Sequence, residues 1–420
     1  MRIAITNWSN RLAGGAEQYI SDIGQILLAR GHELSLCHEA SDPEERDLIP
    51  LPTSAVTWNI HELGLENALF GLRQWRPDVI YCQGMLDPWT EARIQEIAPT
   101  VLFAHNYNGT CISGSRTTHF PIVQPCTRRF GPACLGRFYP LRCGGLNPVT
   151  MIRDYQRSAQ RLSVLSSYGQ VITHSAYVAR EFRRNEIRCE TVRFFTSGPA
   201  RDLPAQRPDW APGKQWRLLM ITRMTEAKGG SLLLRALPSI AARLSKPVKL
   251  VMAGDGPSRA RWEVKAARLC RIYPEIEVLF PGWLSGHRRE EVLSETDLLL
   301  MPSLWPEPFG MAGPEAGHWG VPAVAFSVGG IPGWLKDGVN GCLAATPATT
   351  SSYCEAVAHC LSDTARYIRL RAAALAAAQA MTIEDHYEDL IRVFQRVLKK
   401  PTASFDSAPL EILNHVTGLL

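Results

Sequence analysis

The chain has 420 residues, of which 45% are hydrophobic and 20% charged, and its formal net charge is +5. This length exceeds one ordinary hydrophobic core and suits two domains, and the composition is that of a soluble globular protein. No stretch approaches the run of about 20 apolar residues that a membrane-spanning helix needs, and the N-terminal MRIAITNW is too short and too polar for a secretory signal. We therefore expect a cytoplasmic protein.

The first half of the chain is predicted to alternate buried strands with helices, because short apolar runs alternate with segments of helical periodicity. The expected strands are 2–6, 33–37, 77–84, 100–106 and 169–177, and the expected helices are 16–30 and 151–169. A strand–helix–strand series is the unit of a doubly wound parallel sheet.

A second series of the same kind follows a segment with four prolines, 199–213, which is the best candidate for an interdomain linker. Its expected strands are 216–223, 248–256, 276–282, 297–303 and 322–330, and its expected helices are 229–244, 257–270, 364–380 and 383–399. The prediction is an α/β protein divided into residues 1–198, with an insertion at 106–150, the linker 199–213, a second domain 214–385, a C-terminal helix 386–400 that packs back on the first domain, and a tail 401–420.

The ends of the predicted strands carry the candidate site, because ligands of doubly wound sheets bind at the carboxyl ends of the strands. Arg223 and Lys228 lie on the loop after one strand, where two cations and a helix N-terminus suit a diphosphate. Taken alone, these cations could also belong to an ordinary surface loop.

The segment WPEPFGMAGPE is the strongest local signal. Its two carboxylates, Glu307 and Glu315, can accept hydrogen bonds from sugar and ribose hydroxyls. Gly310 lets the backbone approach a ligand closely. The amides at the start of the following helix can cradle phosphate.

Three further strand ends contribute candidates. Gly254 lies in a Gly-Asp-Gly-Pro turn, Gly15 in a Gly-Gly loop before a helix, and His105 closes a buried strand. No Asp-x-Asp pair occurs in the sequence, so we expect cations and helix dipoles, without a metal ion, to neutralise a diphosphate.

Together and in this order, these motifs resemble glycosyltransferase family 4 over nearly the whole chain. The matching residues are 14–17, 105–106, 223, 228–229, 253–257, 307–310, 315, 329–332 and 337–341. The resemblance implies a GT-B fold, in which two Rossmann-like doubly wound domains face each other across a cleft. It also implies a retaining hexosyltransferase that moves a sugar from a nucleotide-diphosphate sugar to a hydroxyl of a glycan or glycolipid, by a metal-independent front-face displacement that requires no cofactor.

The resemblance also assigns roles to residues. Catalysis is assigned to His105, Glu307, Arg223 and Lys228, and donor binding to Gly15, Arg223, Lys228, Gly254, Phe309, Gly310, Met311 and Glu315. Within these sets, the two cations hold the diphosphate, Glu307 contacts the transferred sugar and Glu315 holds the ribose. One departure is Gly333, where many relatives carry Glu.

Two other functions stay open at this point. One is a GT-B sugar-nucleotide epimerase, and the other is a non-catalytic, glycosyltransferase-like binding subunit. The presence of all the assigned residues favours the transferase.

The insertion has an unusual composition. The insertion and the start of the following helix, residues 106–161, together carry eight arginines, no lysine and one acidic residue. This pattern is typical either of a solvated basic surface or of a site for anionic headgroups or a phosphate-bearing acceptor, and both interpretations stay open. The second would give a peripheral contact with the inner membrane face, and no nucleic-acid partner is expected. The insertion also contains four cysteines, which are candidates for structural zinc or for partly buried thiols: Cys111, Cys126, Cys134 and Cys143.

Overall fold

The computed structural model describes residues 1–12, 14–40, 48–51, 55–196 and 213–399. Contacts divide the chain into two compact units, of which the first contains residues 1–122, 126–195 and 383–420, and the second contains 123–125 and 196–382. The predicted linker, apart from Gly213, and the predicted tail 401–420 lie outside the described residues. No helix in the described part is both long and apolar enough to cross a membrane.

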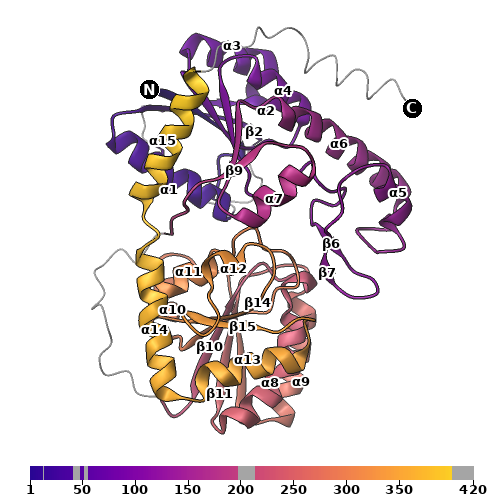
Figure 1. Cartoon of the computed structure of the whole chain (residues 1–420), viewed down its shortest axis with the longest axis vertical. Helices are drawn as coiled ribbons and strands as arrows, with labels where there is room; N and C mark the ends of the chain where they lie inside the picture. The colour runs from indigo at the N-terminus through magenta and orange to yellow at the C-terminus, as the bar shows by residue number, and fades with distance from the viewer. Residues whose placement is uncertain (13, 41–47, 52–54, 197–212, 400–420) are drawn as a thin grey trace. The chain divides into compact units, whose positions relative to one another are not determined.

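The first unit is built on a seven-stranded parallel sheet with the strand order β3-β2-β1-β4-β5-β8-β9 (Figure 1). Its strands are β1 (Arg2–Ser9), β2 (Glu33–Ala40), β3 (Val56–Asn59), β4 (Val79–Gly84), β5 (Thr100–Phe103), β8 (Gln170–Thr173) and β9 (Cys189–Thr191). In the register, Ile3 pairs with Leu34 on one side and with Val79 on the other. The central strands are nearly continuous runs of apolar residues, as expected for a parallel sheet that is buried on both faces.

The helices of the first unit connect successive strands. They are α1 (Gly15–Ala29), α2 (Ile60–Leu63), α3 (Leu65–Trp75), α4 (Pro88–Gln95), α5 (Ala133–Phe138), α6 (Pro148–Ser166) and α7 (Ala176–Arg184). The insertion, which has no clear periodicity in the sequence, contains α5 and two short strands, β6 (Thr117–Thr118) and β7 (Gln124–Pro125).

The C-terminal helix α15 (Ile383–Lys399) belongs to the first unit. It packs against α1 and β5, and its buried face contains Leu390, Phe394 and Val397. Gly169 permits this packing, because a Cβ there would lie 2.7 Å from Cγ1 of Val397. The boundary predicted after residue 385 therefore falls three residues inside this helix.

The second unit contains a six-stranded parallel sheet with the order β12-β11-β10-β13-β14-β15. The strands are β10 (Trp216–Ile221), β11 (Val248–Ala253), β12 (Ile276–Gly282), β13 (Leu298–Met301), β14 (Ala323–Phe326) and β15 (Gly341–Ala344). The helical segments are η1 (Glu226–Lys228), α8 (Gly230–Leu244), α9 (Arg259–Ile272), α10 (Gly286–Glu295), α11 (Ala312–Gly317), α12 (Ile331–Trp334), α13 (Thr350–Leu361) and α14 (Thr364–Gln379).

Both sheets follow the doubly wound order, which confirms the predicted fold class. The direction of winding reverses between β1 and β4 in the first unit and between β10 and β13 in the second. At such a reversal the loops at the carboxyl ends diverge to opposite faces and leave a crevice for ligands. The loops after these four strands are therefore the expected ligand-binding loops.

Candidate functional site

In the second unit, the loops after β10 and β13 are tied together by backbone hydrogen bonds. The amides of Leu304 and Trp305 both donate to the carbonyl of Ala227, at 2.8 and 3.1 Å. Gly229 ends this loop at φ +79°, and a Cβ there would lie 1.9 Å from the carbonyl oxygen of Pro302. Only glycine fits this close approach, and the contact sets Lys228 beside the loop that carries Glu307.

Lys228 and Glu307 form an ion pair at the carboxyl edge of the second sheet, where the loops after β10 and β13 lie. Their Nζ and Oε1 atoms are 2.6 Å apart, and the ammonium lies 4.4 Å from the centre of the Trp305 ring. Glu307 is 7% exposed, so the pair is largely shielded from water and its carboxylate keeps a fixed direction. The structure thus brings together two residues that are 79 positions apart in the sequence.

The Gly329-Gly330 turn after β14 holds the backbone of Glu307. The Gly330 amide donates to the Glu307 carbonyl at 2.7 Å. Gly329 has φ +61°, and a Cβ there would lie 2.1 Å from the same carbonyl oxygen. This turn matched the family motif in the sequence, and here it fixes the loop after β13 that presents the carboxylate.

The segment from Phe309 to Met311 is packed against α12. The indole Nε1 of Trp334 donates to the Phe309 carbonyl at 2.7 Å. Gly313 lies under the same indole, since a Cβ there would be 1.9 Å from Cη2 of Trp334. Gly310 adopts φ +87°, and Met311 precedes the first residue of α11.

Glu315 lies in α11 and forms an ion pair with Arg289 of α10. Both side chains are partly exposed, at 18% and 34%. Arg289 was not identified from the sequence, because it lies in the run GHRREE, which resembles any exposed charged helix. An arginine that neutralises Glu315 also orients it, so Arg289 is an additional residue of this edge.

Gly254 connects the ends of three neighbouring strands. Its amide donates to the Gly282 carbonyl at 2.7 Å, and a Cβ would lie 2.0 Å from the carbonyl oxygen of Thr222. The following residue, Asp255, accepts the Met224 amide at 2.7 Å through its carbonyl. These bonds hold the loop that carries the exposed side chain of Arg223.

In the first unit, His105 lies at the carboxyl end of β5 and its Nε2 is 2.8 Å from Oε1 of Gln83 in β4. A carbonyl oxygen can only accept, so Nε2 carries the proton and Nδ1 is left as an acceptor. Burial among aromatic rings, together with the neighbouring His386, lowers the pKa of His105 to about 3. The imidazole is therefore neutral at physiological pH.

His386 and Tyr19 complete this aromatic cluster. Nε2 of His386 is 2.6 Å from the Tyr19 hydroxyl, and its Nδ1 is 2.6 Å from the Arg193 carbonyl. Burial lowers the pKa of His386 to about 4. The cluster joins α1, β5 and α15, and it was not identified from the sequence because α15 lies more than 350 positions from α1.

The other predicted residue of the first unit, Gly15, is the first residue of α1 and is exposed. Gly14, the N-cap of α1, precedes it and follows β1, at the reversal of the sheet. Glu17, which continues the motif, is buried and accepts a hydrogen bond from Trp8 Nε1 at 2.9 Å. Its carboxylate therefore anchors the loop to β1.

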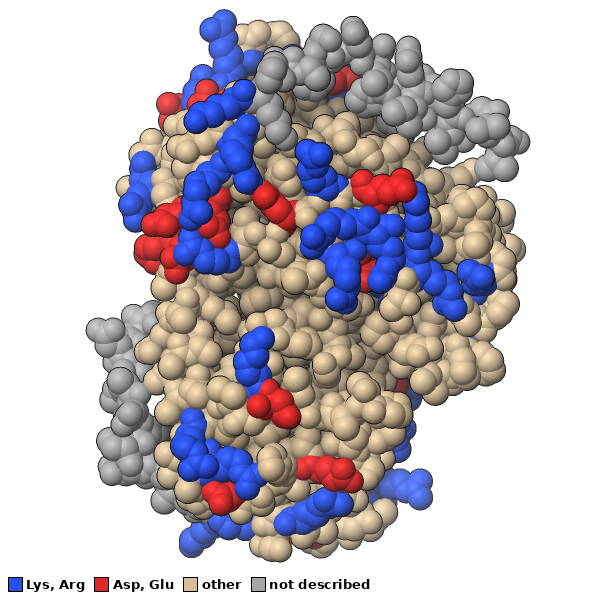
Figure 2. Space-filling model, in the orientation of Figure 1, with Lys and Arg blue, Asp and Glu red and all other residues tan. Residues whose placement is uncertain are grey.

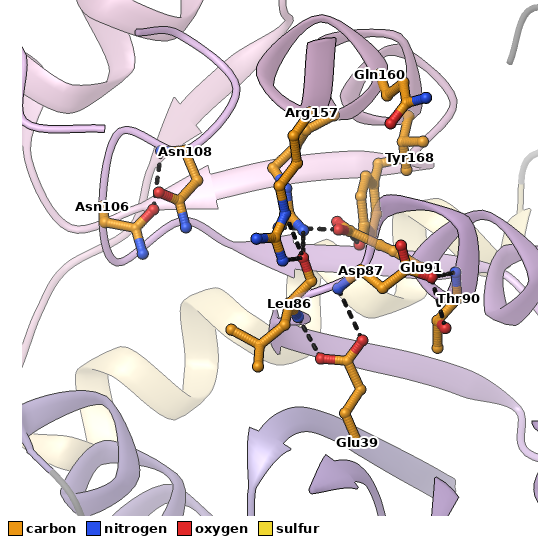
Figure 3. A network of polar contacts seen from close by, with 12 residues as sticks. Glu39, Leu86, Asp87, Thr90, Glu91, Asn106, Asn108, Arg157, Gln160 and Tyr168 are labelled. Atoms are coloured by element: carbon orange, nitrogen blue, oxygen red, sulfur yellow. Dashed lines mark hydrogen bonds and ion pairs between the residues drawn. The ribbon is translucent and has the colours of Figure 1, made fainter. Parts of the chain in front are cut away.

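A polar network fixes the loop after β4, next to the same reversal (Figure 3). The Glu39 carboxylate accepts the amides of Leu86 and Asp87, the latter at 2.8 Å. The Leu86 carbonyl accepts from Arg157 and Arg161 of α6. Burial raises the pKa of Glu39, although its backbone hydrogen bonds oppose the shift. The backbone of the loop after β4 is therefore fixed by a carboxylate that accepts two of its amides and by two arginines that donate to one of its carbonyls.

The four cysteines of the insertion line one cavity of about 30 Å³, together with Arg116 and other residues. Burial raises the pKa of Cys143 to about 11, and the neighbouring thiols add to the shift. Within the described ranges, no group of three or more His, Cys, Asp or Glu is arranged to hold a metal ion. Structural zinc therefore stays a prediction that this conformation does not support.

Comparison with known proteins adds the family. The model of Glycosyltransferase Family 4 matches residues 13–198, and that of Glycosyl transferases group 1 matches residues 204–379. An uncharacterized glycosyltransferase of Methanocaldococcus jannaschii is 25% identical over 372 residues, which cover 81% of this chain and 84% of that protein. A D-inositol 3-phosphate glycosyltransferase of Stackebrandtia nassauensis is 31% identical over 177 residues, 42% of this chain and 39% of that one.

Solved structures share the fold at low sequence identity. Sucrose-phosphate synthase from Thermosynechococcus elongatus aligns with a TM-score of 0.69 and 17% identity, over 94% of this chain and 99% of that one. Anabaena HepE in complex with UDP and glucose aligns with a TM-score of 0.62 and 19% identity, over 94% and 98%. With family models matching both halves and two doubly wound sheets in the structure, the chain belongs to glycosyltransferase family 4 and has the GT-B fold.

Proposed function

We propose that this glycosyltransferase moves a hexose from a nucleotide-diphosphate sugar to a hydroxyl of a glycan or glycolipid, with retention of anomeric configuration. The observation that carries the proposal is the Lys228–Glu307 pair, which lies where the strand order of the second sheet reverses. A cation at this position can neutralise a diphosphate, and the adjoining carboxylate can accept hydrogen bonds from sugar hydroxyls. The solved complex of the structural relative HepE contains UDP and glucose, which supports a donor of this class.

The proposed reaction is a front-face displacement. The bond between the anomeric carbon and the diphosphate oxygen breaks, and the acceptor oxygen bonds to the anomeric carbon on the same face. The departing diphosphate oxygen takes the proton of the acceptor hydroxyl. Arg223 and Lys228 stabilise the charge that develops on the diphosphate, so the chain's own contribution is orientation and electrostatic stabilisation.

The remaining residues have positioning roles in this proposal. Glu315, oriented by Arg289, holds the ribose, and Gly254 allows the nucleotide to approach the backbone. The backbone amides of Phe309, Gly310 and Met311 lie beside the transferred sugar, and Gly15 is assigned to donor binding. His105, which is neutral at physiological pH, offers Nδ1 to a sugar hydroxyl, because its low pKa makes it a poor base.

The test begins with a thermal-shift screen against UDP-, GDP-, ADP- and dTDP-sugars, since a ligand that binds only the native state raises the melting temperature. Calorimetric titration of the best donor then compares Lys228→Met with Lys249→Met. Lys249 lies near the amino end of β11 and pairs with Glu277 at 3.6 Å, so it is a lysine of the same domain away from the carboxyl ends of the strands. We expect Lys228→Met to weaken donor binding at least tenfold and Lys249→Met to leave it unchanged.

Transfer itself is assayed with the identified donor and a panel of glycan and glycolipid acceptors. The expected product has the anomeric configuration of the donor by NMR, and its rate is unchanged by EDTA because no metal is needed. Inverted product would contradict the mechanism. Epimer formed from the donor without acceptor would identify an epimerase, and the absence of binding to every nucleotide sugar would favour a non-catalytic subunit.

A further inference from the structure

Large apolar side chains are exposed at the start of α6 and in the loop before it. Leu146 is 84% exposed, Val149 73% and Ile152 46%. Val149 and Ile152 are three residues apart in the helix, so they adjoin on its surface. Met151 of the same turn packs inward against the small core of the insertion. The first turn of α6 is therefore apolar on its outer face as well as on its inner face, which is typical of an interaction surface.

Two other exposed aromatic residues lie in, or are hydrogen-bonded to, the loop that leads from α5 to α6. Phe120 is 50% exposed and Tyr139 37%. The Phe120 amide donates to the carbonyl of Leu141 at 3.2 Å, and the Arg142 guanidinium lies 5.5 Å from the centre of the Phe120 ring. We call this surface the insertion edge and define it by Phe120, Tyr139, Arg142, Leu146, Val149 and Ile152.

The eight arginines that the sequence places between residues 106 and 161 do not contribute equally to surface charge. Arg116 and Arg161 are buried and form ion pairs with Glu181 and Glu91. Arg129 pairs with Glu186 at 2.6 Å. A uniformly basic surface is therefore not what the insertion presents.

Four of the eight arginines, namely Arg128, Arg137, Arg142 and Arg157, are exposed and form no ion pair with a residue that the structure describes. Two of them, Arg137 and Arg142, lie in α5 and in the loop between α5 and α6, next to the insertion edge. Arg153 is 74% exposed and its only carboxylate partner in the described residues is Asp154, at 4.0 Å. Figure 2 shows a larger gathering of Lys and Arg around α7, but there Arg184 is paired with Glu181 at 2.7 Å.

We propose that the insertion edge docks on an anionic lipid bilayer, with the apolar side chains entering the headgroup–acyl boundary and the arginines binding lipid phosphates. Exposed apolar residues flanked by cations, with no carboxylate among the defining residues, match an anionic bilayer, which has a negatively charged headgroup layer over an apolar acyl interior. The long arginine side chains can keep their guanidinium groups among the headgroups while the turn inserts. A specific protein partner would require a binding surface of complementary shape, whereas a bilayer requires only exposed apolar residues and cations.

This inference does not depend on the transferase proposal, because it concerns binding without donor or acceptor. The experiment measures co-sedimentation of the full chain with vesicles of phosphatidylcholine, alone or with phosphatidylglycerol. We expect binding to the mixed vesicles and weak binding to the neutral ones. The variant Leu146→Ser/Val149→Ser/Ile152→Ser should lower the partition coefficient at least tenfold, and Arg137→Gln/Arg142→Gln should lower it about fivefold per arginine on anionic vesicles only.

Matched controls come from α9 of the second unit. Val264 and Ile272 are 71% and 59% exposed, and Arg268 and Arg271 are exposed, so their serine and glutamine variants change equally exposed side chains of the same kinds. These controls should bind the mixed vesicles as the wild type does. A second readout is a tryptophan introduced by Val149→Trp, which brominated lipids should quench.

Three results would overturn the proposal. The first is equal binding of the insertion-edge triple variant and the wild type to anionic vesicles. The second is an unquenched tryptophan at position 149 in vesicle-bound protein. The third is a wild-type protein that does not bind vesicles but self-associates through the insertion edge, as measured by light scattering. This result would show that the surface is a contact between copies of the chain.

Discussion

Buried histidines make the first unit sensitive to acid, and His386 allows the effect to be measured. The perturbation is His386→Gln. In the native state burial lowers the pKa of His386 to about 4, whereas an imidazole in the unfolded chain has a pKa of about 6.5. Between these values the unfolded state binds a proton that the native state does not bind. The contribution of a neutral His386 to stability is therefore fully present above pH 6.5 and is lost as the pH falls toward 4.

The magnitude follows from the two pKa values. At pH 5 the unfolded imidazole is almost fully protonated and the native one is not, so the native state loses about 2 kcal/mol relative to neutral pH. For a unit of this size that corresponds to about 4–8 °C in melting temperature. Calorimetric scans at pH 7.5 and pH 5 measure the loss. We expect the fall in melting temperature between the two pH values to be about 4–8 °C smaller in His386→Gln than in the wild type.

The matched control is Tyr19→Phe. It removes the hydroxyl that lies 2.6 Å from His386 Nε2 but retains the buried imidazole. Both variants should melt at a lower temperature than the wild type at pH 7.5, because each loses a buried hydrogen bond. Only His386→Gln should reduce the pH dependence, and the reasoning is refuted if it loses as much stability between pH 7.5 and 5 as the wild type does.

Three further predictions concern packing, a buried ion pair and metal content. Gly313→Ala should lower the free energy of unfolding of the second unit by about 1–3 kcal/mol in calorimetry, because its Cβ would overlap the Trp334 indole. The control is Gly333→Ala, whose Cβ would meet nothing within 4 Å, and this variant should melt at the same temperature as the wild type. Arg116→Met should destabilise the first unit by about 3–5 kcal/mol in calorimetry, because Glu181 loses a partner in a buried ion pair, and an unchanged melting temperature would contradict this. Mass spectrometric metal analysis should find less than one zinc per chain, and stoichiometric zinc would show that the loops bearing the four cysteines close around an ion.

Much of the second unit was predictable because its signals are local. The strands 216–223 and 248–256 were expected from apolar runs, and the structure has them at Trp216–Ile221 and Val248–Ala253. The doubly wound order then places Lys228 and Glu307 on neighbouring loops, since β10 and β13 adjoin at the reversal. The ends of strands can be predicted from the sequence alone, and the rules of doubly wound topology then predict which strand ends lie close together.

What could not be predicted were the partners. Arg289 pairs with Glu315 across 26 positions, and Gln83 binds His105 across 22. Neither residue carries a local signal, because a charged helix and a buried amide occur in most proteins. The aromatic cluster around Tyr19 depends on a helix that returns to the first unit after the whole second unit has been traversed. Such pairings exist only in the folded chain.

The insertion shows the same limitation for electrostatics. A count of +7 over residues 106–161 treats each arginine as a free surface charge, yet Glu91, Glu181 and Glu186, which neutralise three of them, all lie outside that window. The charge of a segment is therefore not the charge of the surface that it forms. The useful electrostatic observation is that Arg137 and Arg142, which form no ion pair with a described residue, lie beside exposed apolar side chains. That combination depends on which carboxylates the fold brings to the other arginines, and so the proposed lipid-binding surface could be defined only after the fold was known.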